Sequence, residues 1–320
     1  MFGNRSFPPP HCFLLASSGG CGSFSIAKHL NKMSDRIRVF HHWDHLDQKA
    51  HFSRYKTEAE ALFALATSSG LVCGSIVGWS SRDELEFCRE HGFSTGALIR
   101  NPLDRGMSLL RIRARDIPTD VLTIGPARSP KTMKSVWAIV ESVYRRSGRD
   151  MWAEIENLKS IRKIDPRHKS IWMRYQFVER FLYNVVKNDL EVMKLFEREN
   201  IHKFEDLVGS PDRFRDFACG LVPESAIDSP TEIFSGGLIS VNRRSRTIDN
   251  KWLVDTLDGD LDFITKCVDV IIETFHSHGQ DLESLYDDFG YDLLGTARSM
   301  KNLSSSPENV GSLTRAPMDR

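Results

Sequence analysis

The stretch CFLLASSGGCGSFSIAKHLNKM, residues 12–33, is the clearest indication of the fold of this chain. A compact apolar run, Cys12–Ala16, is followed by the glycine-rich turn SSGGCGS and then by a helical pattern over residues 23–33. A glycine-rich turn that leads from a strand into a helix directs several backbone N–H groups, and the positive end of the helix dipole, at one point. We therefore expect a buried strand, an anion-binding loop and a helix in succession.

Strand-like and helix-like segments alternate on the C-terminal side of this stretch. The expected strands are residues 36–40 (RIRVF), 71–77 (LVCGSIV) and 95–99 (TGALI), and the expected helices between them are residues 57–66 and 82–91. Strands separated by helices of about ten residues predict βαβ units and a parallel sheet. Further along, helix periodicity runs from Tyr175 to Phe196 and from Asp262 to Phe275. The pattern predicts an α/β fold in which helices flank a parallel sheet and the C-terminal half is largely helical.

The ends of the chain differ in composition from the rest. Residues 1–11 are polar and rich in proline, which predicts a flexible lead, and residues 302–320 are rich in Ser, Pro and Asn, which predicts a disordered tail. The length of 320 residues allows one large domain or two small ones. Because no change in composition between these ends indicates a second domain, we expect a single α/β domain over residues 12–301.

The charge and hydropathy of the chain argue against several classes of partner, although a local basic patch stays compatible with a net charge of zero. Its 43 basic and 43 acidic residues give a formal net charge of zero, so no global attraction to nucleic acid or to an acidic membrane is expected. No apolar run approaches the ~20 residues of a membrane span, and Cys12–Ala16 is shorter than the roughly 7–15-residue core of a signal peptide. The six cysteines are scattered, which predicts buried thiols rather than disulfides. We expect cytoplasmic localisation, with no nucleic-acid or membrane partner; nothing in the sequence indicates an oligomeric state.

The glycine-rich loop is the first candidate site. Its glycines allow the positive φ angles of an anion-binding nest, and its serines offer hydroxyl donors. It is not a Walker A loop, because no Gly-Lys-Ser/Thr follows the glycines, and it lacks the G-x-G-x-x-G spacing of a dinucleotide fingerprint. A plain turn between strand and helix is the alternative. The candidate binding residues are Ser18, Gly19, Gly20, Cys21, Gly22, Ser23, Phe24 and Ser25.

The sequence RNPLDRGMS, residues 100–108, is the second candidate site. An arginine at the carboxyl end of a strand faces the crevice where open α/β sheets bind ligands. The guanidinium of Arg100 is suited to bind phosphate through two parallel hydrogen bonds, and Ser108, one to two turns into the next helix, adds a hydroxyl. The alternative for Arg100 is a structural ion pair with Asp104.

The order of these two motifs resembles that of the sulfotransferase superfamily, whose members take a sulfuryl group from 3′-phosphoadenosine 5′-phosphosulfate (PAPS). In that family the first loop cradles the 5′-phosphosulfate, and an arginine and a serine eight positions later hold the 3′-phosphate; Arg100 and Ser108 stand at that spacing. Residues 201–221 resemble a further family segment, with Phe204 in place of its usual tyrosine. Residues 68–79 resemble a segment of the bacterial trehalose-type (carbohydrate) sulfotransferases.

The resemblance covers roughly residues 12–255 and implies a P-loop-like α/β fold. It implies in-line sulfuryl transfer from PAPS to a hydroxyl of a carbohydrate or other small acceptor, without a metal. By placement, Arg243 and Arg244 are similar to a late basic loop of the family that closes over the 3′-phosphate, and a solvated charge run is the alternative. A nucleotide kinase is disfavoured, because the Gly-Lys-Ser/Thr of that class is missing.

One departure from the family concerns the charge of the first loop. The family usually has Lys or Arg just before the Gly-Ser/Thr of that loop, whereas this chain has no basic residue between Ala16 and Lys28. Ser75 also stands where trehalose-type enzymes tend to have lysine. Either Lys28 or an arginine of residues 242–246 stabilises the leaving phosphate, or the chain is a degenerate relative that binds a 3′-phosphonucleotide or a protein partner without turnover. A nucleophilic Cys21 is disfavoured, because transfer in this family is normally direct.

The segment FHHWDHLDQ, residues 40–48, follows the second expected strand and supplies candidates for a catalytic base. Trehalose-type enzymes place their base in this region, and a histidine, whose unperturbed pKa is about 6.5, accepts a hydroxyl proton at neutral pH. By alternation along the strand, His41 falls on the face that the apolar residues bury, so we favour His42, with His41 and Asp44 as alternatives. Surface histidines without a role are a further alternative. No motif such as HExxH indicates a metal site, and we expect none.

Overall fold

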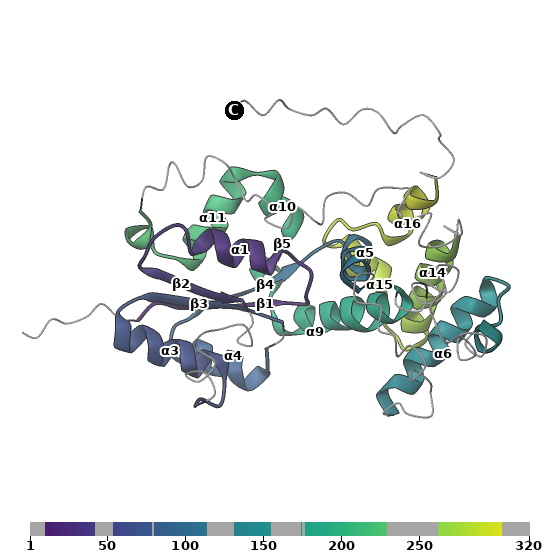
Figure 1. Ribbon diagram of the computed structural model, residues 1–320, viewed down its shortest axis with the longest axis horizontal. Helices are drawn as coiled ribbons and strands as arrows, with labels where there is room; N and C mark the ends of the chain where they lie inside the picture. The colour runs from purple at the N-terminus through teal and green to yellow at the C-terminus, as the bar shows by residue number, and fades with distance from the viewer. Residues whose placement is uncertain are drawn as a thin grey trace, which may run out of the picture. The chain divides into compact units, whose positions relative to one another are not determined.

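The computed structural model describes residues 10–41, 54–78, 80–113, 131–154, 174, 177–228 and 262–302. Its central element is a sheet of five parallel strands in the order β2-β3-β1-β4-β5 (Figure 1). The strands are β1 (Cys12–Ser17), β2 (Ile37–His41), β3 (Val72–Val77), β4 (Ser94–Ile99) and β5 (Ile201–Lys203). The first strand of the chain therefore lies at the centre of the sheet.

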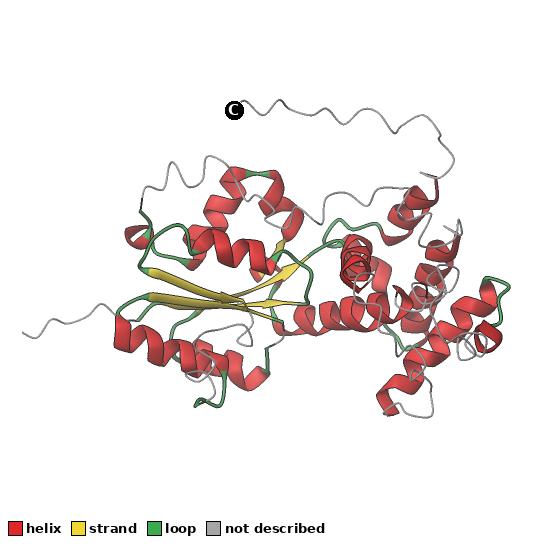
Figure 2. Cartoon of the chain, viewed as in Figure 1, coloured by secondary structure: helices red, strands yellow, loops and turns green. Residues whose placement is uncertain are grey.

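Helices cover both faces of the sheet. On one face lie α1 (Ser23–Leu30), α10 (Phe204–Gly209) and α11 (Pro211–Leu221), and on the other lie α3 (Glu58–Ser69) and α4 (Arg82–Glu90) (Figure 2). Parallel sheets are covered in this way because the crossover connections between their strands run over the faces. The expected α/β fold, with a parallel sheet flanked by helices, is confirmed.

The other described elements are all helical. They are α5 (Pro102–Arg113), α6 (Lys131–Arg146), the π-helix η4 (Arg180–Lys187), α9 (Asn188–Leu195), the 3₁₀ turns η5 (Arg198–Asn200) and η6 (Glu224–Ala226), α14 (Asp262–Ser277), α15 (Leu282–Asp287) and α16 (Leu293–Asn302). The expected helical C-terminal half is thus confirmed. The apolar periodicity from Tyr175 to Phe196 predicts an ordinary helix, and the structure has a π-helix before α9, because that periodicity does not distinguish i→i+5 from i→i+4 bonding.

Burial on both faces explains why β1 is apolar throughout. Phe13 and Leu15 pack with the apolar side chains of α1 and α11, and Cys12 and Leu14 pack with those of α3 and α4. All six residues of β1 are buried. Because both faces are buried, the sequence of a central strand in a parallel sheet is a continuous apolar run. The glycine-rich loop directly follows the carboxyl end of β1.

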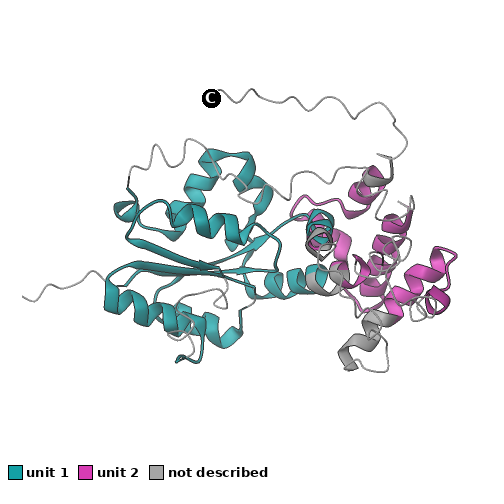
Figure 3. Cartoon of the chain, in the orientation of Figure 1, with its two compact units in different colours: residues 1–108, 183–246 teal, residues 109–182, 247–320 magenta. Residues whose placement is uncertain are grey.

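The chain divides into two compact units, residues 1–108 with 183–246 and residues 109–182 with 247–320 (Figure 3). The first contains the sheet and its flanking helices. The described part of the second is helical, and within it the ring of Tyr144 meets that of Phe263 edge to face at 5.9 Å. The expectation of a single domain over residues 12–301 stays a prediction.

Two further expectations concern the ends of the chain and membranes. Residues 1–9 and 303–320 lie outside the described residues, so the flexible lead and the disordered tail stay predictions. Among the described residues, no helix combines the length and the apolar character needed to cross a membrane.

The three-residue strand β5 was not expected from the sequence, because so short a segment shows no alternation.

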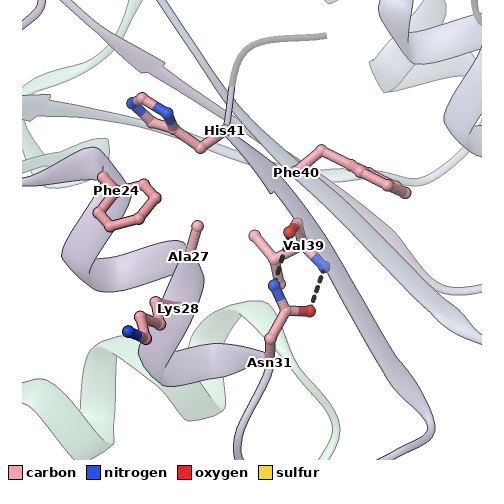
Figure 4. A pocket seen from close by; sticks show the side chains of 7 residues that line it. All are labelled: Phe24, Ala27, Lys28, Asn31, Val39, Phe40 and His41. Atoms are coloured by element: carbon pink, nitrogen blue, oxygen red, sulfur yellow. Dashed lines mark hydrogen bonds between the residues drawn. The ribbon is translucent and has the colours of Figure 1, made fainter. Parts of the chain in front are cut away.

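An asparagine side chain covers the outer edge of β2. Asn31, which follows α1, donates from Nδ2 to the carbonyl of Val39 at 2.7 Å and accepts from the N–H of Val39 at 2.8 Å (Figure 4). β2 is an edge strand, and the backbone groups of such strands otherwise face solvent or another chain. The side-chain amide therefore takes the place of a neighbouring strand at this residue and ties α1 to β2.

Replacement of Asn31 by alanine removes both hydrogen bonds. We expect Asn31→Ala to lower the free energy of unfolding by about 1–2 kcal/mol, because each such bond contributes about 0.5–1.5 kcal/mol net. Urea unfolding followed by circular dichroism measures the change. Lys32→Ala, at the exposed next position, is the control and should leave the free energy nearly unchanged. Equal stability of the two variants would show that the two hydrogen bonds from Asn31 to Val39 do not stabilise the edge strand β2.

Candidate functional site

The candidate site lies where β1 ends. The connection from β1 runs to α1 on one face of the sheet, whereas β2 and β3 lead to α3 and α4 on the opposite face (Figure 1). Connections that leave in opposite directions open a crevice at the carboxyl ends of the strands, where open α/β sheets bind ligands. The glycine loop, residues 18–22, lies at this point and leads into the first turn of α1.

The backbone of the glycine loop has the left-handed conformation that an anion nest requires. The φ angles of Gly19, Gly20 and Gly22 are 81°, 71° and 72°. Gly22 is the N-cap of α1, and no side chain caps the helix there. The first N–H groups of a helix have no partner within the helix, and successive backbone N–H groups in turns of this kind converge on anions. The geometry suits a phosphate or sulfate group.

The side chains of the loop divide between the interior and the surface. Ser18, Cys21, Ser23 and Ser25 are buried, whereas the Phe24 side chain is 54% exposed. Ser18 Oγ donates to the Asp189 carboxylate at 2.5 Å, and Cys21 Sγ donates to the carbonyl of Gly19 at 3.6 Å. Since Ser18 and Cys21 point inward, the backbone and Phe24 are the parts of the loop that a ligand would meet.

Arg100 lies against the same loop. Its Nη1 donates to the carbonyl of Gly20 at 3.3 Å, and its guanidinium lies over the ring of Phe204, 5.4 Å from the ring centre. Arg100 follows β4, the strand beside β1, which explains how residues 80 positions apart in the sequence meet. The alternative ion pair with Asp104 is absent from the contacts between described residues, although Arg100 partly offsets the rise in the pKa of Asp104 that burial causes.

The second arginine of RNPLDRGMS, Arg105, was given no role from the sequence, and it has several buried partners in the site. Arg105 and Asp189 are fully buried, and Arg105 Nη1 meets Asp189 Oδ1 at 2.5 Å. Arg105 also donates to Ser18 Oγ and, at 3.6 Å, to Cys21 Sγ. The sequence signal was its place in the Arg-Asn-Pro-x-x-Arg motif, whereas no local pattern indicates its partner 84 residues away.

His41 lies at the end of β2, on the face of α1. Its Nε2 is 2.8 Å from Ser23 Oγ, and its ring meets that of Phe24 edge to face at 5.7 Å (Figure 4). The alternation along the strand predicts that His41 shares a face with Ile37 and Val39, and these two residues pack with α1. A pocket of about 580 Å³ opens beside the histidine, and its lining residues are Phe24, Ala27, Lys28, Asn31, Val39, Phe40 and His41. Pockets of this size accommodate small molecules.

Several expected site residues are not brought together. Ser108 lies half-buried in α5, and no hydrogen bond joins it to Arg100 among the described contacts. His42, Asp44, Arg243 and Arg244 lie outside the described residues. Within the described ranges no three His, Cys, Asp or Glu side chains form a group that could hold a metal ion.

Comparison with known proteins identified no relative of this chain. No family model, curated protein or solved structure gave a significant match to the chain. The chemistry of the site therefore rests on its own geometry. A left-handed glycine loop, a helix N-terminus and an arginine that contacts the loop favour the binding of an anion, and a histidine bonded to the first residue of α1 offers a proton acceptor.

Gly19 and Gly22 are glycines for different physical reasons. A Cβ on Gly22 would overlap the ring of Phe204, whereas a Cβ on Gly19 would meet no atom within 4 Å. Both have positive φ. Gly19 is therefore glycine for its backbone angle alone, and Gly22 also because an aromatic ring packs directly on the loop.

Substitution by alanine tests this distinction. Gly19→Ala should lower the free energy of unfolding by about 1–2 kcal/mol, the strain of a left-handed alanine. Gly22→Ala should lower it by at least ~1 kcal/mol more, because the added methyl group displaces Phe204. Urea unfolding of both variants measures the difference. An equal loss in the two variants would contradict the packing of Phe204 on Gly22.

Proposed function

We propose that this chain is a PAPS-dependent sulfotransferase, which moves a sulfuryl group from PAPS to a hydroxyl of a carbohydrate or other small acceptor. The main support is one observation: three left-handed glycines lead into the N-terminus of α1 at the carboxyl end of the central strand, and Arg100 is bonded to the same loop. This arrangement presents backbone donors and a guanidinium to a ligand that has two separate anionic groups, as the bisphosphorylated nucleotide has.

The proposed reaction is an in-line displacement at sulfur. The acceptor oxygen attacks the sulfuryl group, the bond from sulfur to the bridging phosphate oxygen breaks, and 3′-phosphoadenosine 5′-phosphate leaves with the bonding electrons. As in phosphoryl transfer, most of the catalysis would come from positioning and from stabilisation of the charge that develops on the leaving oxygen. The loop N–H groups and the N-terminus of α1 supply that stabilisation in this proposal.

Two cations among the described residues lie near the proposed nucleotide site. Arg100 is half-buried and contacts the loop, and Lys28 is exposed on α1 beside His41 and Phe24. Arg105 is excluded from direct contact with a ligand because its side chain is fully buried. We therefore assign the 3′-phosphate to Arg100 and keep Lys28, or an arginine of residues 242–246, as the cation that the loop lacks at the leaving phosphate.

We propose His41 as the base that accepts the proton of the acceptor hydroxyl. Its imidazole is hydrogen-bonded to the hydroxyl of Ser23, the first residue of α1, and therefore lies beside the glycine loop. The proton then moves from the acceptor oxygen to the imidazole as the bond to sulfur forms. His42 was favoured from the sequence; together with Asp44, it remains the alternative.

The pocket beside His41 is the proposed acceptor site. Phe24 presents an aromatic face there, and Lys28 adds a positive charge (Figure 4). An apolar wall with few polar groups is typical of sites for small ligands. A ring that bears a hydroxyl fits this wall and places the hydroxyl near the imidazole.

A second candidate function is nucleotide binding without turnover. It is favoured by one observation, the absence of a basic residue in the loop between Ala16 and Lys28. Loss of one preorganised donor from such a site typically costs about 3–4 kcal/mol in the transition state. Turnover of PAPS by the purified chain distinguishes the two functions, because both bind the nucleotide and only the first releases its sulfuryl group.

Arg100→Ala tests the contact with the nucleotide. We expect the variant to fold and to bind 3′-phosphoadenosine 5′-phosphate about 10–150-fold more weakly, because a charge-assisted hydrogen bond contributes about 1.5–3 kcal/mol. Titration calorimetry measures the affinity. Arg36→Ala, which removes an exposed arginine before β2, is the matched control and should bind normally. Normal binding by Arg100→Ala, together with a lower melting temperature, would make Arg100 a structural residue.

Turnover of two neighbouring variants tests the base. His41→Ala should lower kcat by at least about 100-fold, the usual contribution of a positioned base, and should leave the affinity for the bisphosphate unchanged. His42→Ala should keep most of the activity. A loss confined to His42→Ala would move the assignment by one residue, and near-normal turnover in both variants would exclude a histidine base at this strand end.

A further inference from the structure

An ion pair without solvent exposure lies beneath the glycine loop. Arg105 of α5 and Asp189 of α9 are both fully buried. Arg105 Nη2 also donates to the carbonyl of Val185, in η4, at 2.9 Å. Taking two charges out of water is unfavourable, and an apolar pair of similar size is often at least as stable. The presence of this pair is therefore weak evidence for a role in global stability. Its contacts with neighbouring residues indicate a local role instead.

The pair touches the two inward-facing side chains of the loop. Ser18 Oγ donates to Asp189 Oδ1 at 2.5 Å and accepts from Arg105 Nη1, and Cys21 Sγ accepts from the same Nη1 at 3.6 Å. Gly19 and Gly20 lie between these two anchored residues. The ion pair therefore holds the loop on both sides of Gly19 and Gly20, two of the three glycines whose left-handed angles form the anion nest.

We infer that Arg105 and Asp189 are positioning residues, which hold the glycine loop in its anion-binding conformation from beneath without touching the ligand. Glycine samples more backbone conformations than any other residue, so a loop with three glycines is costly to order. Anchored at Ser18 and Cys21, the loop is ordered before the ligand arrives. That the ligand is a bisphosphorylated nucleotide rests on the proposed function; the anchoring does not.

Cys21 is a built-in reporter of loop opening. Its side chain is 0% exposed, and burial raises the pKa of its thiol. Alkylating reagents need an accessible thiolate, so Cys21 reacts only when the loop opens. Cys12, Cys73 and Cys88 belong to the core on the opposite face of the same sheet. Burial raises their pKa to about 12, and they serve as internal controls for global unfolding.

The experiment replaces the ion pair in the full-length chain and measures alkylation of each cysteine by iodoacetamide, with peptide mass spectrometry. Arg105→Met/Asp189→Leu removes both charges and leaves apolar side chains, which favours retention of the fold. Asp189→Asn is the conservative second variant, which keeps an acceptor for Ser18. In both variants we expect Cys21 to react at least about tenfold faster than in the wild type. Cys12, Cys73 and Cys88 should remain protected.

Two results overturn the inference. An unchanged rate at Cys21 in both variants means that the ion pair does not hold the loop. Equal acceleration at all four cysteines means that the pair contributes only to global stability.

A ligand measurement on the same proteins separates this inference from the proposed function. The double variant should bind 3′-phosphoadenosine 5′-phosphate at least about tenfold more weakly than the wild type, because the loop must be ordered on binding. Wild-type affinity in a double variant whose Cys21 has become reactive would contradict the positioning role. Absence of binding by the wild type would end the proposed function, and the alkylation rates would still decide whether the pair anchors the loop.

Discussion

The left-handed turn that joins β1 to α1 fixes both the path of the chain out of the sheet and the geometry of the candidate site. A buried central strand must pass into a helix over five residues, 18–22, and three of them, Gly19, Gly20 and Gly22, have positive φ. Only glycine adopts such angles without strain. The same turn places the left-handed glycines and the N-terminus of α1 at the edge where the parallel strands end, so the geometry that connects the elements also forms the candidate site.

Three charges around this turn have different environments, and the environment decides what each can do. Arg105 is fully buried against Asp189 and can act only through the loop. Arg100 is half-buried, is bonded to the loop carbonyl of Gly20 and lies over Phe204. Lys28 is exposed beside the pocket. Positive charge is thus available beside the loop from Arg100, directly after β4, and from Lys28 of α1, which is the physical basis for proposing a functional anion site.

The sequence predicted those parts of the structure whose signal is local. The apolar run before SSGGCGS identified β1, and the glycines identified the loop. Alternation along β2 placed His41 on the same face as Ile37 and Val39, and in the structure this is the face of α1, where His41 meets Ser23. The partner of Arg105 could not be predicted, because Asp189 is 84 residues away and no periodicity links the two. The same limit applies to Phe204, whose ring packs on Gly22 from a helix beyond β5.

We propose that this site recognises a nucleotide with phosphates at the 3′ and 5′ positions, so its preference among nucleotides is decisive. Titration calorimetry of the wild-type chain with 3′-phosphoadenosine 5′-phosphate, AMP and ATP compares the three ligands under one set of conditions. We expect the bisphosphate to bind at least about tenfold more tightly than AMP, a difference of about 1.4 kcal/mol, and more tightly than ATP. Equal affinity for the bisphosphate and AMP, or a preference for ATP, would contradict this proposal.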